Sequence, residues 1–358
     1  MKSERVEFCR RHASADEYFE IKDPSVVEAP EGGYYLYASN GISRDLPWVV
    51  GRFYADTPEG PWQELGPVTI TGIDGPEVVA PAVIRTVENG KAVYKMYIQT
   101  SCFGADGMIA VATSDDGIHF TGDAAPALTR ADIAEPVITL YDVAISDMTL
   151  GGKSFECMTF SGYRDIGITN PFVGCGDVFT SLREKGTVEW QQPRLALRQE
   201  DVPFHNRPGS PHYEWGLEGA KVIQLAEDAF LMVGVCFLDK DTSARGTRQR
   251  VFFAAGSSPG GPFKPMGTPV DPTVYPEGTG ENGHPDTIDR GDKIGLLYQE
   301  RAGEGQGKPW HLRYGEMDKA DLLAQVRARL APPAAHPLIN QPANHAAPVA
   351  APKPRRFG

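Results

Sequence analysis

The sequence predicts an all-β protein, folded as one five-bladed β-propeller with a short C-terminal helix and a Pro/Ala-rich tail. Two observations predict this fold. Apolar or aromatic runs bounded by Gly, Asp or Pro dominate the chain, which is typical of strands joined by tight turns. These runs also recur in one order, as a strand, a tight turn, a central strand and a further strand, at intervals of roughly 60 residues. Four-stranded antiparallel units in such an array are typical of propeller blades.

Each of the five blades is expected to begin with an inner strand and a central strand. The central strands are the strongest apolar runs, at 34–39, 94–100, 154–160, 230–237 and 293–299. Each of them follows a weaker apolar run and a turn such as "EGG" or "ENGK". In most units a third strand, a small-residue turn and an aromatic residue follow, as in "VVGRFYADTPEGPW". The propeller is therefore expected to span 19–317, after a polar rim segment at 1–18.

The chain changes character after the last blade. Residues 318–331 begin with Asp318, a candidate N-cap, and carry apolar residues at helical spacing, so we expect a helix there. Residues 332–358 are rich in Pro, Ala and Asn and can bury little surface. We therefore expect an extended or disordered tail.

Composition limits the classes of partner. The net charge of −12 argues against nucleic acid and against an anionic membrane, because both are bound by clustered Lys and Arg. No apolar run approaches the ~20 residues of a membrane span, and the first residues lack the apolar segment of a secretory signal. These features favour a cytoplasmic protein. The five cysteines are widely separated and form no CxxC pair, which argues against a zinc site or a disulfide framework. The oligomeric state stays open.

Four polar residues stand at the openings of inner strands. Asp23 opens blade one in "IKDPSVV", Asp142 opens blade three in "LYDVAIS", and Glu218 opens blade four in "WGLEGAKVI". His284 opens blade five in "NGHPDTI". Each alone is most simply interpreted as a turn residue or a buried, hydrogen-bonded group. Because inner strands line the central channel of a propeller, all four are expected to meet near its axis, where costly charges indicate a function.

The motifs around these residues resemble those of glycoside hydrolase family 43 and its five-bladed relatives. The matching stretches, in blade order, are "DPSVVEAPEGGYYLYAS", "APAVIRTVENGKAVYKMYIQT", "YDVAI", "EGAKVI" and "GHPDTI". The resemblance covers about residues 19 to 317. Val143 stands where many family members carry Pro, and Glu-Gly-Ala replaces Glu-Gly-Pro at Glu218. These departures indicate a divergent branch, in which the substrate is less determined than the fold.

The resemblance implies an inverting glycosidase that cleaves a short oligosaccharide, such as an α-L-arabinofuranoside or a β-xyloside. It implies Asp23 as the base that activates water and Glu218 as the acid that protonates the leaving oxygen. Asp142 is implied as the group that keeps the acid protonated and orients it. This chemistry requires no cofactor. His284 is expected to hold a water or a cation such as Ca²⁺ near the axis, with water as the main ligand of that cation.

Sugar binding calls for flat aromatic rings and for polar side chains beside the acids. The aromatic candidates are Trp48, Phe103, Tyr163 and Trp215, in loops that flank inner strands. Arg164 and Arg301 follow central strands and are candidates for contacts with sugar hydroxyls. The simpler interpretation is that the tryptophans pack between blades and the arginines pair with neighbouring acids.

Three other functions stay open. A glycoside phosphorylase would need cations beside the acids, which Arg164, His205, Arg207 and His212 could supply. A propeller that only binds a glycan or a protein predicts that the three acids are scattered rather than convergent. A recruited activity on a substrate other than a sugar is the third, because a fold does not fix a function.

Overall fold

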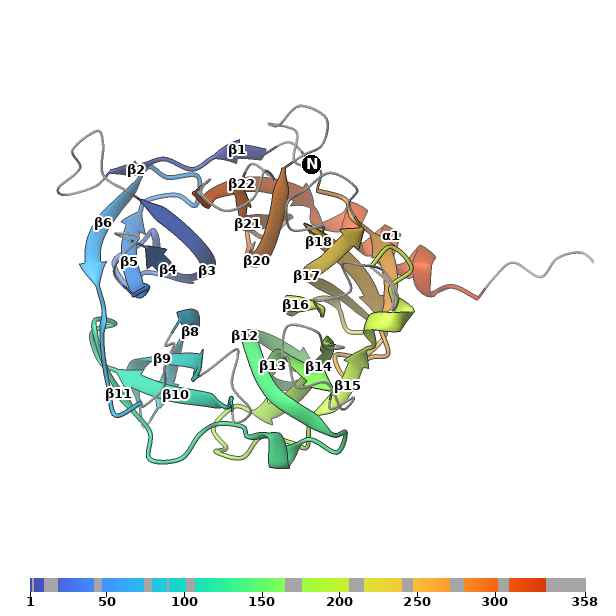
Figure 1. The fold of residues 1–358 in the computed structure, drawn as a ribbon, viewed down its shortest axis with the longest axis horizontal. Helices are drawn as coiled ribbons and strands as arrows, with labels where there is room; N and C mark the ends of the chain where they lie inside the picture. Colours follow the sequence, from blue (N-terminus) through green and yellow to red (C-terminus); the bar gives the residue numbers. More distant parts are fainter. Residues whose placement is uncertain are drawn as a thin grey trace, which may run out of the picture.

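The computed structural model describes residues 1, 3–9, 19–41, 47–73, 79–88, 90–100, 107–164, 176–205, 216–239, 247–270, 280–301 and 309–332. Within these ranges, five separate sheets surround a common axis, as Figure 1 shows. The predicted five-bladed β-propeller is therefore confirmed. Four residues named above lie outside the described ranges, namely Phe103, Arg207, His212 and Trp215, and so does the tail at 333–358.

The strands of each blade follow one another outward from the axis. Blade one contains β3 (Glu20–Glu28), β4 (Tyr34–Gly41), β5 (Val49–Ala55) and β6 (Trp62–Pro67). Blade two contains β8 (Val79–Glu88), β9 (Lys91–Gln99), β10 (Ile109–Ser114) and β11 (His119–Gly122). Blade three contains β12 (Val137–Leu150), β13 (Lys153–Arg164), β14 (Gly176–Glu184) and β15 (Arg194–Leu197).

Blades four and five repeat this order. Blade four contains β16 (Glu218–Ala226), β17 (Ala229–Asp239), β18 (Thr247–Gly256) and β19 (Lys264–Gly267). Blade five contains β20 (Glu281–Asp289), β21 (Lys293–Arg301) and β22 (His311–Asp318). The strands nearest the axis are thus β3, β8, β12, β16 and β20 (Figure 1). The expected central strands correspond to β4, β9, β13, β17 and β21.

Edge strands connect neighbouring blades. The first strand, β1 (Ser3–Arg5), pairs with β22 on the outside of blade five. The second strand, β2 (Phe8–Cys9), pairs with β6 on the outside of blade one. Likewise β7 (Thr69–Thr71), which follows blade one, pairs with β11 of blade two. The first nine residues therefore link the first blade to the last. Two short 3₁₀ helices, η1 (Arg130–Asp132) and η2 (Gln199–Asp201), lie in blade three's connections.

The hydrophobic core is divided into clusters that lie between adjacent blades. One cluster joins Cys157 of blade three to Phe230 and Cys236 of blade four, and the next joins blade four to blade five. Each blade thus buries the apolar faces of its neighbours, which explains why no blade needs a core of its own.

The predicted C-terminal helix is confirmed as α1 (Lys319–Leu330). The carboxylate of its N-cap, Asp318, accepts hydrogen bonds from the backbone N–H groups of Ala320 and Asp321. Leu322 and Val326 bury its apolar face against the cluster between blades four and five. Among the described residues, no helix is both long and apolar enough to cross a membrane.

Candidate active site

A β-bulge interrupts all five inner strands close to their first residues. The strand register shifts between Lys22/Ser25, Val79/Ala82, Tyr141/Ala144, Glu218/Lys221 and Gly283/Asp286. One residue in each bulge has a φ between 42° and 53°, in the order Asp23, Ala80, Asp142, Gly219 and His284. A positive φ is uncommon for residues other than glycine, and bulges often re-aim side chains beside active sites. The bulges therefore set the directions of three of the four candidate axis residues.

In blade four the acid is not the bulge residue with the positive φ. The residue with the positive φ is Gly219, and Glu218 precedes it. A Cβ atom on Gly219 would lie 2.9 Å from His284 Nδ1, so only glycine lets the imidazole come this close. Lys22 in blade one and Tyr141 in blade three take the same place before the bulge as Glu218 takes in blade four.

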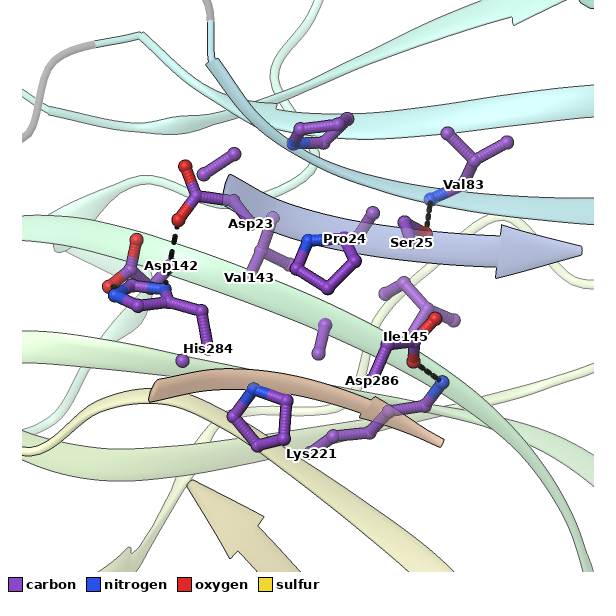
Figure 2. Close-up of a pocket in the computed structure, with 16 residues that line it drawn as sticks. Asp23, Pro24, Ser25, Val83, Asp142, Val143, Ile145, Lys221, His284 and Asp286 are labelled. Carbon is purple, nitrogen blue, oxygen red and sulfur yellow. Dashed lines mark hydrogen bonds and ion pairs between the residues drawn. The ribbon is translucent and has the colours of Figure 1, made fainter. Parts of the chain in front are cut away.

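Three of the four axis residues, Asp23, Asp142 and Glu218, converge on the imidazole ring of the fourth, His284. His284 Nδ1 lies 3.2 Å from Asp23 Oδ1 and 3.8 Å from Asp142 Oδ2. On the other side of the ring, Nε2 lies 3.6 Å from Glu218 Oε2. Figure 2 shows Asp23, Asp142 and His284 pointing toward one another from three different inner strands. Their side chains are at most 13% exposed, so the charges interact with little screening by water.

Burial and mutual charge set the protonation of this cluster. Burial raises the pKa of Asp142 to about 7, with the charges of Glu218 and Asp23 adding to the rise and His284 opposing it. Burial alone would lower the pKa of His284, but Asp142, Asp23 and Glu218 together raise it to about 9. At neutral pH the ring is therefore an imidazolium, surrounded by three carboxyl groups.

Lys22 is a residue of this site that the sequence reasoning missed. Its Nζ lies 3.6 Å from Asp23 Oδ2 and 4.8 Å from the centroid of the Trp48 ring. Burial would raise the pKa of Asp23, but Lys22, the charge of His284 and a hydrogen bond with Ser39 outweigh it, so the pKa lies below its usual value. No local sequence pattern marks this lysine; the bulge register of the structure places it beside the acid, in the position that Glu218 takes in blade four. Trp48, a predicted sugar-binding residue, thus lies beside the site.

Tyr163 forms part of the packing behind the acids. It is 3% exposed, and its ring stacks on Tyr141 with centroids 4.5 Å apart and planes 17° apart. The Tyr141 hydroxyl donates a hydrogen bond to the carbonyl oxygen of Leu217, the residue before Glu218, at 3.2 Å. The stacked pair therefore supports the strand that carries Glu218.

The two predicted sugar-binding arginines both have charged partners in the structure. Arg164 Nε lies 2.8 Å from Asp177 Oδ2, and its NH2 group also pairs with Glu200. Arg301 Nε donates to Glu281 Oε2 at 2.8 Å. These ion pairs correspond to the simpler interpretation given above for both side chains.

A small cavity of about 40 Å³ lies among the bulges. Ser25, Lys221 and Asp286 also line this cavity. Each lies two residues further along its strand than the bulge residue with the positive φ. Lys221 Nζ forms an ion pair with Asp286 Oδ1 (Figure 2). Asp286 Oδ2 accepts a hydrogen bond from the N–H of Val26 at 2.6 Å. The cavity has room for a few water molecules, since each needs roughly 10–15 Å³ of such space.

The donor atoms near the axis do not fit a directly bound Ca²⁺. Asp142, Glu218 and His284 each offer one atom, and these atoms lie within 4.8 Å of one another. Ca²⁺ takes about 6–8 oxygen ligands, and this set offers two carboxylates and a nitrogen. Both ring nitrogens of His284 already face carboxylates. Any cation here would need water for most of its ligands. A cation bound through water stays an expectation from the sequence.

Comparison with known proteins gives structural matches only. No family model and no curated protein matches the chain. An endo-arabinase from Bacteroides thetaiotaomicron has 15% identity and a TM-score of 0.57, over 82% of this chain and 93% of that chain. A thermostable family-43 glycoside hydrolase has 17% identity and a TM-score of 0.56, over 84% and 90%. An α-L-arabinofuranosidase from Lactobacillus brevis has 14% identity and a TM-score of 0.55, over 83% and 90%. The chain therefore has the five-bladed β-propeller fold of glycoside hydrolase family 43 structures, which its sequence motifs predicted.

Proposed function

We propose that this protein is an inverting glycoside hydrolase in which Asp23 is the general base and Glu218 the general acid. One observation carries the proposal: carboxyl groups from three blades, Asp23, Asp142 and Glu218, meet around the imidazolium of His284. The fold supports it, because similar structures are named as an arabinase, a glycoside hydrolase and an arabinofuranosidase. A propeller that only binds its ligand was expected to have scattered acids.

In this reaction Glu218 gives its proton to the leaving glycosidic oxygen while Asp23 takes a proton from a water. The water oxygen forms a bond to the anomeric carbon on the face opposite the bond that breaks, so the configuration inverts. The base must be ionised, and the low pKa of Asp23 beside Lys22 and His284 provides this. Exchange of protons with solvent then restores both carboxyl groups.

The two carboxyl groups lie on opposite sides of one imidazole ring, with 3.2 Å from Nδ1 to Asp23 and 3.6 Å from Nε2 to Glu218. These contacts set an upper limit of roughly 9 Å on the separation of the nearest carboxyl oxygens, which admits both the inverting range of about 6.5–9.5 Å and the retaining range of about 5–5.5 Å. Inversion is therefore proposed from the sequence motifs, and the configuration of the first product tests it. Asp142 shares His284 with both acids, so we assign it the role of holding the ring between them.

The substrate we propose is a short oligosaccharide that ends in an α-L-arabinofuranosyl or β-xylosyl residue. The names of the similar structures support the first of these sugars. Trp48 provides an aromatic ring close to the base. The phosphorylase alternative has less support, because Arg164 is paired with two acids and His205 Nδ1 accepts a hydrogen bond from the Phe237 N–H at 3.1 Å.

Leaving-group dependence tests the two roles. We expect Glu218→Ala to lower kcat on an oligosaccharide by about 10²–10⁴-fold, which is the usual contribution of a general acid. On a dinitrophenyl glycoside the loss should be small, because that leaving group needs no proton. Asp23→Ala should lose activity on both substrates. Asp228→Ala, an exposed acid paired with Arg327, is the control.

Three results would contradict the proposal. Equal losses on both substrates in Glu218→Ala would exclude this residue as the acid. Retention of configuration in the first product, read by NMR of the anomeric proton, would exclude inversion. A requirement for phosphate, with a sugar 1-phosphate as product, would establish the phosphorylase alternative instead.

A further inference from the structure

We propose that Gln299 and Gln99 are positioning residues for the two aspartates of the site. Each glutamine lies in the blade that precedes the blade of its aspartate. Its side-chain amide oxygen accepts a hydrogen bond from the backbone N–H of that aspartate. The catalytic consequence of this arrangement rests on the function proposed above, whereas the hydrogen bonds themselves can be tested without it.

The two contacts are equivalent in geometry. The N–H of Asp23 donates to Gln299 Oε1 at 3.0 Å, and the N–H of Asp142 donates to Gln99 Oε1 at 2.7 Å. Both glutamines are buried, at 1% and 3% exposure. Gln299 lies on the central strand of blade five and reaches blade one, and Gln99 lies on the central strand of blade two and reaches blade three. Gln249 Oε1 accepts from Gln299 Nε2 at 3.4 Å, which fixes the direction of that amide.

The bulges explain why these N–H groups need a partner. A bulge leaves one residue outside the ladder of the sheet, so the N–H groups of Asp23 and Asp142 would otherwise be buried without an acceptor. Both residues also have a positive φ, of 53° and 50°, which persists only where the surroundings hold it. The amide hydrogen bond therefore fixes the backbone from which each carboxylate projects toward His284.

The same position in the other blades shows that glutamine is not required for the fold. The central-strand residues that pair with the residue before each bulge are Ser39, Gln99, Ser161, Val235 and Gln299. Ser39 Oγ accepts from the N–H of Ala80 in the next blade, at 2.9 Å. Val235 precedes the His284 bulge and has no acceptor in its side chain. Glutamine occurs in the two blades that precede an aspartate bulge, and at none of the other three positions of the set.

The test compares methionine variants, because methionine has nearly the length of glutamine but lacks the amide. Gln299→Met and Gln99→Met should each lower kcat at least about ten-fold with KM changed less than about three-fold, since a small displacement of a reacting group costs this much or more. Gln299→Glu keeps an acceptor for the Asp23 N–H and should retain more activity than Gln299→Met.

A matched control is available at the other end of the channel. Gln224 Oε1 also accepts a backbone hydrogen bond from a neighbouring blade, from the N–H of Thr149 at 2.8 Å. Gln224→Met removes this bond, together with the one that Gln224 Nε2 donates to the Thr149 carbonyl oxygen at 2.7 Å, away from the acids. Its kcat should stay within about two-fold of the wild type. In parallel, amide hydrogen exchange should speed up at Asp23 in Gln299→Met and at Thr149 in Gln224→Met.

The outcomes separate this inference from the proposed function. A wild type inactive on every glycoside contradicts the proposed function, and hydrogen exchange together with a crystal structure of Gln299→Met then decides the positioning. Unchanged exchange at Asp23, or a carboxylate still 3.2 Å from His284, overturns it. Equal effects on kcat in the Gln299 and Gln224 variants also overturn it. If Gln299→Met does not fold, Gln299→Asn replaces it, because its shorter amide cannot reach the same N–H.

Discussion

The buried ion pair of Lys221 and Asp286 predicts that its two partners contribute unequally to stability. Their side chains are 13% and 7% exposed. Asp286 has two further donors, the N–H of Val26 at 2.6 Å and the N–H of Thr287 at 2.8 Å. For Lys221, the described part of the chain provides one ion-pair partner, which is Asp286. Removing Lys221 therefore leaves an aspartate that keeps two backbone donors, whereas removing Asp286 leaves a lysine without this counterion.

The magnitudes follow from what each substitution leaves behind. Lys221→Met leaves a carboxylate that still accepts two backbone hydrogen bonds, so we expect a loss of about 1–3 kcal/mol in the free energy of unfolding. Asp286→Ala leaves a buried ammonium without a counterion, which costs about 3–5 kcal/mol, and it also removes the acceptor of the Val26 N–H. The double variant should be more stable than Asp286→Ala alone, because the stranded charge is gone.

Urea unfolding at pH 7 measures the free energy of unfolding of each variant. The slope of this free energy against urea concentration is compared between variants, so that a change in slope is not mistaken for a change in stability. Lys293→Met is the control, since Lys293 is 51% exposed and its pair with Glu316 should contribute no more than about 1 kcal/mol. A loss in Lys221→Met equal to or larger than that in Asp286→Ala would refute the reasoning, because the two backbone donors would then not stabilise the carboxylate.

Three further predictions concern charge. Lys22→Met should raise the pKa of Asp23 by removing the charge that lowers this pKa most, so the acidic limb of the pH–rate profile should move to higher pH. The His284 imidazole should titrate near pH 9 by NMR, and Asp142→Asn should lower this pKa because it removes the largest of the charges that raise it. Since the folded-state pKa lies above the ordinary 6.5, the imidazolium stabilises the fold below pH 6.5, and this contribution is lost as the pH rises through about 9. Arg183→Met should destabilise the fold by about 3–5 kcal/mol, because its buried carboxylate partner loses its counterion.

Each of these predictions has a control or an outcome that would contradict it. Lys22→Arg keeps the cation and should leave the acidic limb in place, and a shift as large as that of Lys22→Met would contradict the electrostatic reason. A His284 resonance that titrates near pH 6.5 would mean that the acids do not surround the ring. If replacing Arg183 and Glu156 together by apolar residues destabilised more than replacing Arg183 alone, the stranded carboxylate would not be the cause.

The sequence predicted the elements whose causes are local. The run at 230–237 is apolar along its whole length and lies within β17 (Ala229–Asp239). Asp318 was recognisable as an N-cap because capping involves residues only two and three positions away. The openings of the inner strands were also recognisable, because a polar residue before an apolar run stands out against its neighbours. The convergence of Asp23 and His284 then followed from the number of blades and the place of each residue in its blade.

Long-range pairing was out of reach of the same reasoning. Gln299 is 276 residues from Asp23, and no local pattern indicates that its amide meets that N–H. Lys22 reads as a surface lysine until the bulge register places it opposite Ser39, beside the acid. The pairing of Arg164 with Glu200 also depends on how the end of β13 meets η2, 36 residues further along the chain. These contacts depend on how distant segments meet in the folded propeller, which the sequence pattern of a single blade does not show.

The pairing of β1 with β22 constrains the order in which parts of this protein can pair during synthesis. Ser3 and Arg313 are 310 positions apart, yet the guanidinium of Arg313 donates to the hydroxyl and the carbonyl oxygen of Ser3. During synthesis, Ser3–Arg5 leaves the ribosome long before its partner strand exists. This pairing cannot form before His311–Asp318 has been synthesised, so β1 has no partner strand until the last blade is complete. The closed ring is thus available only to the full-length propeller, and a chain that ends before β22 keeps the edge of β21 open.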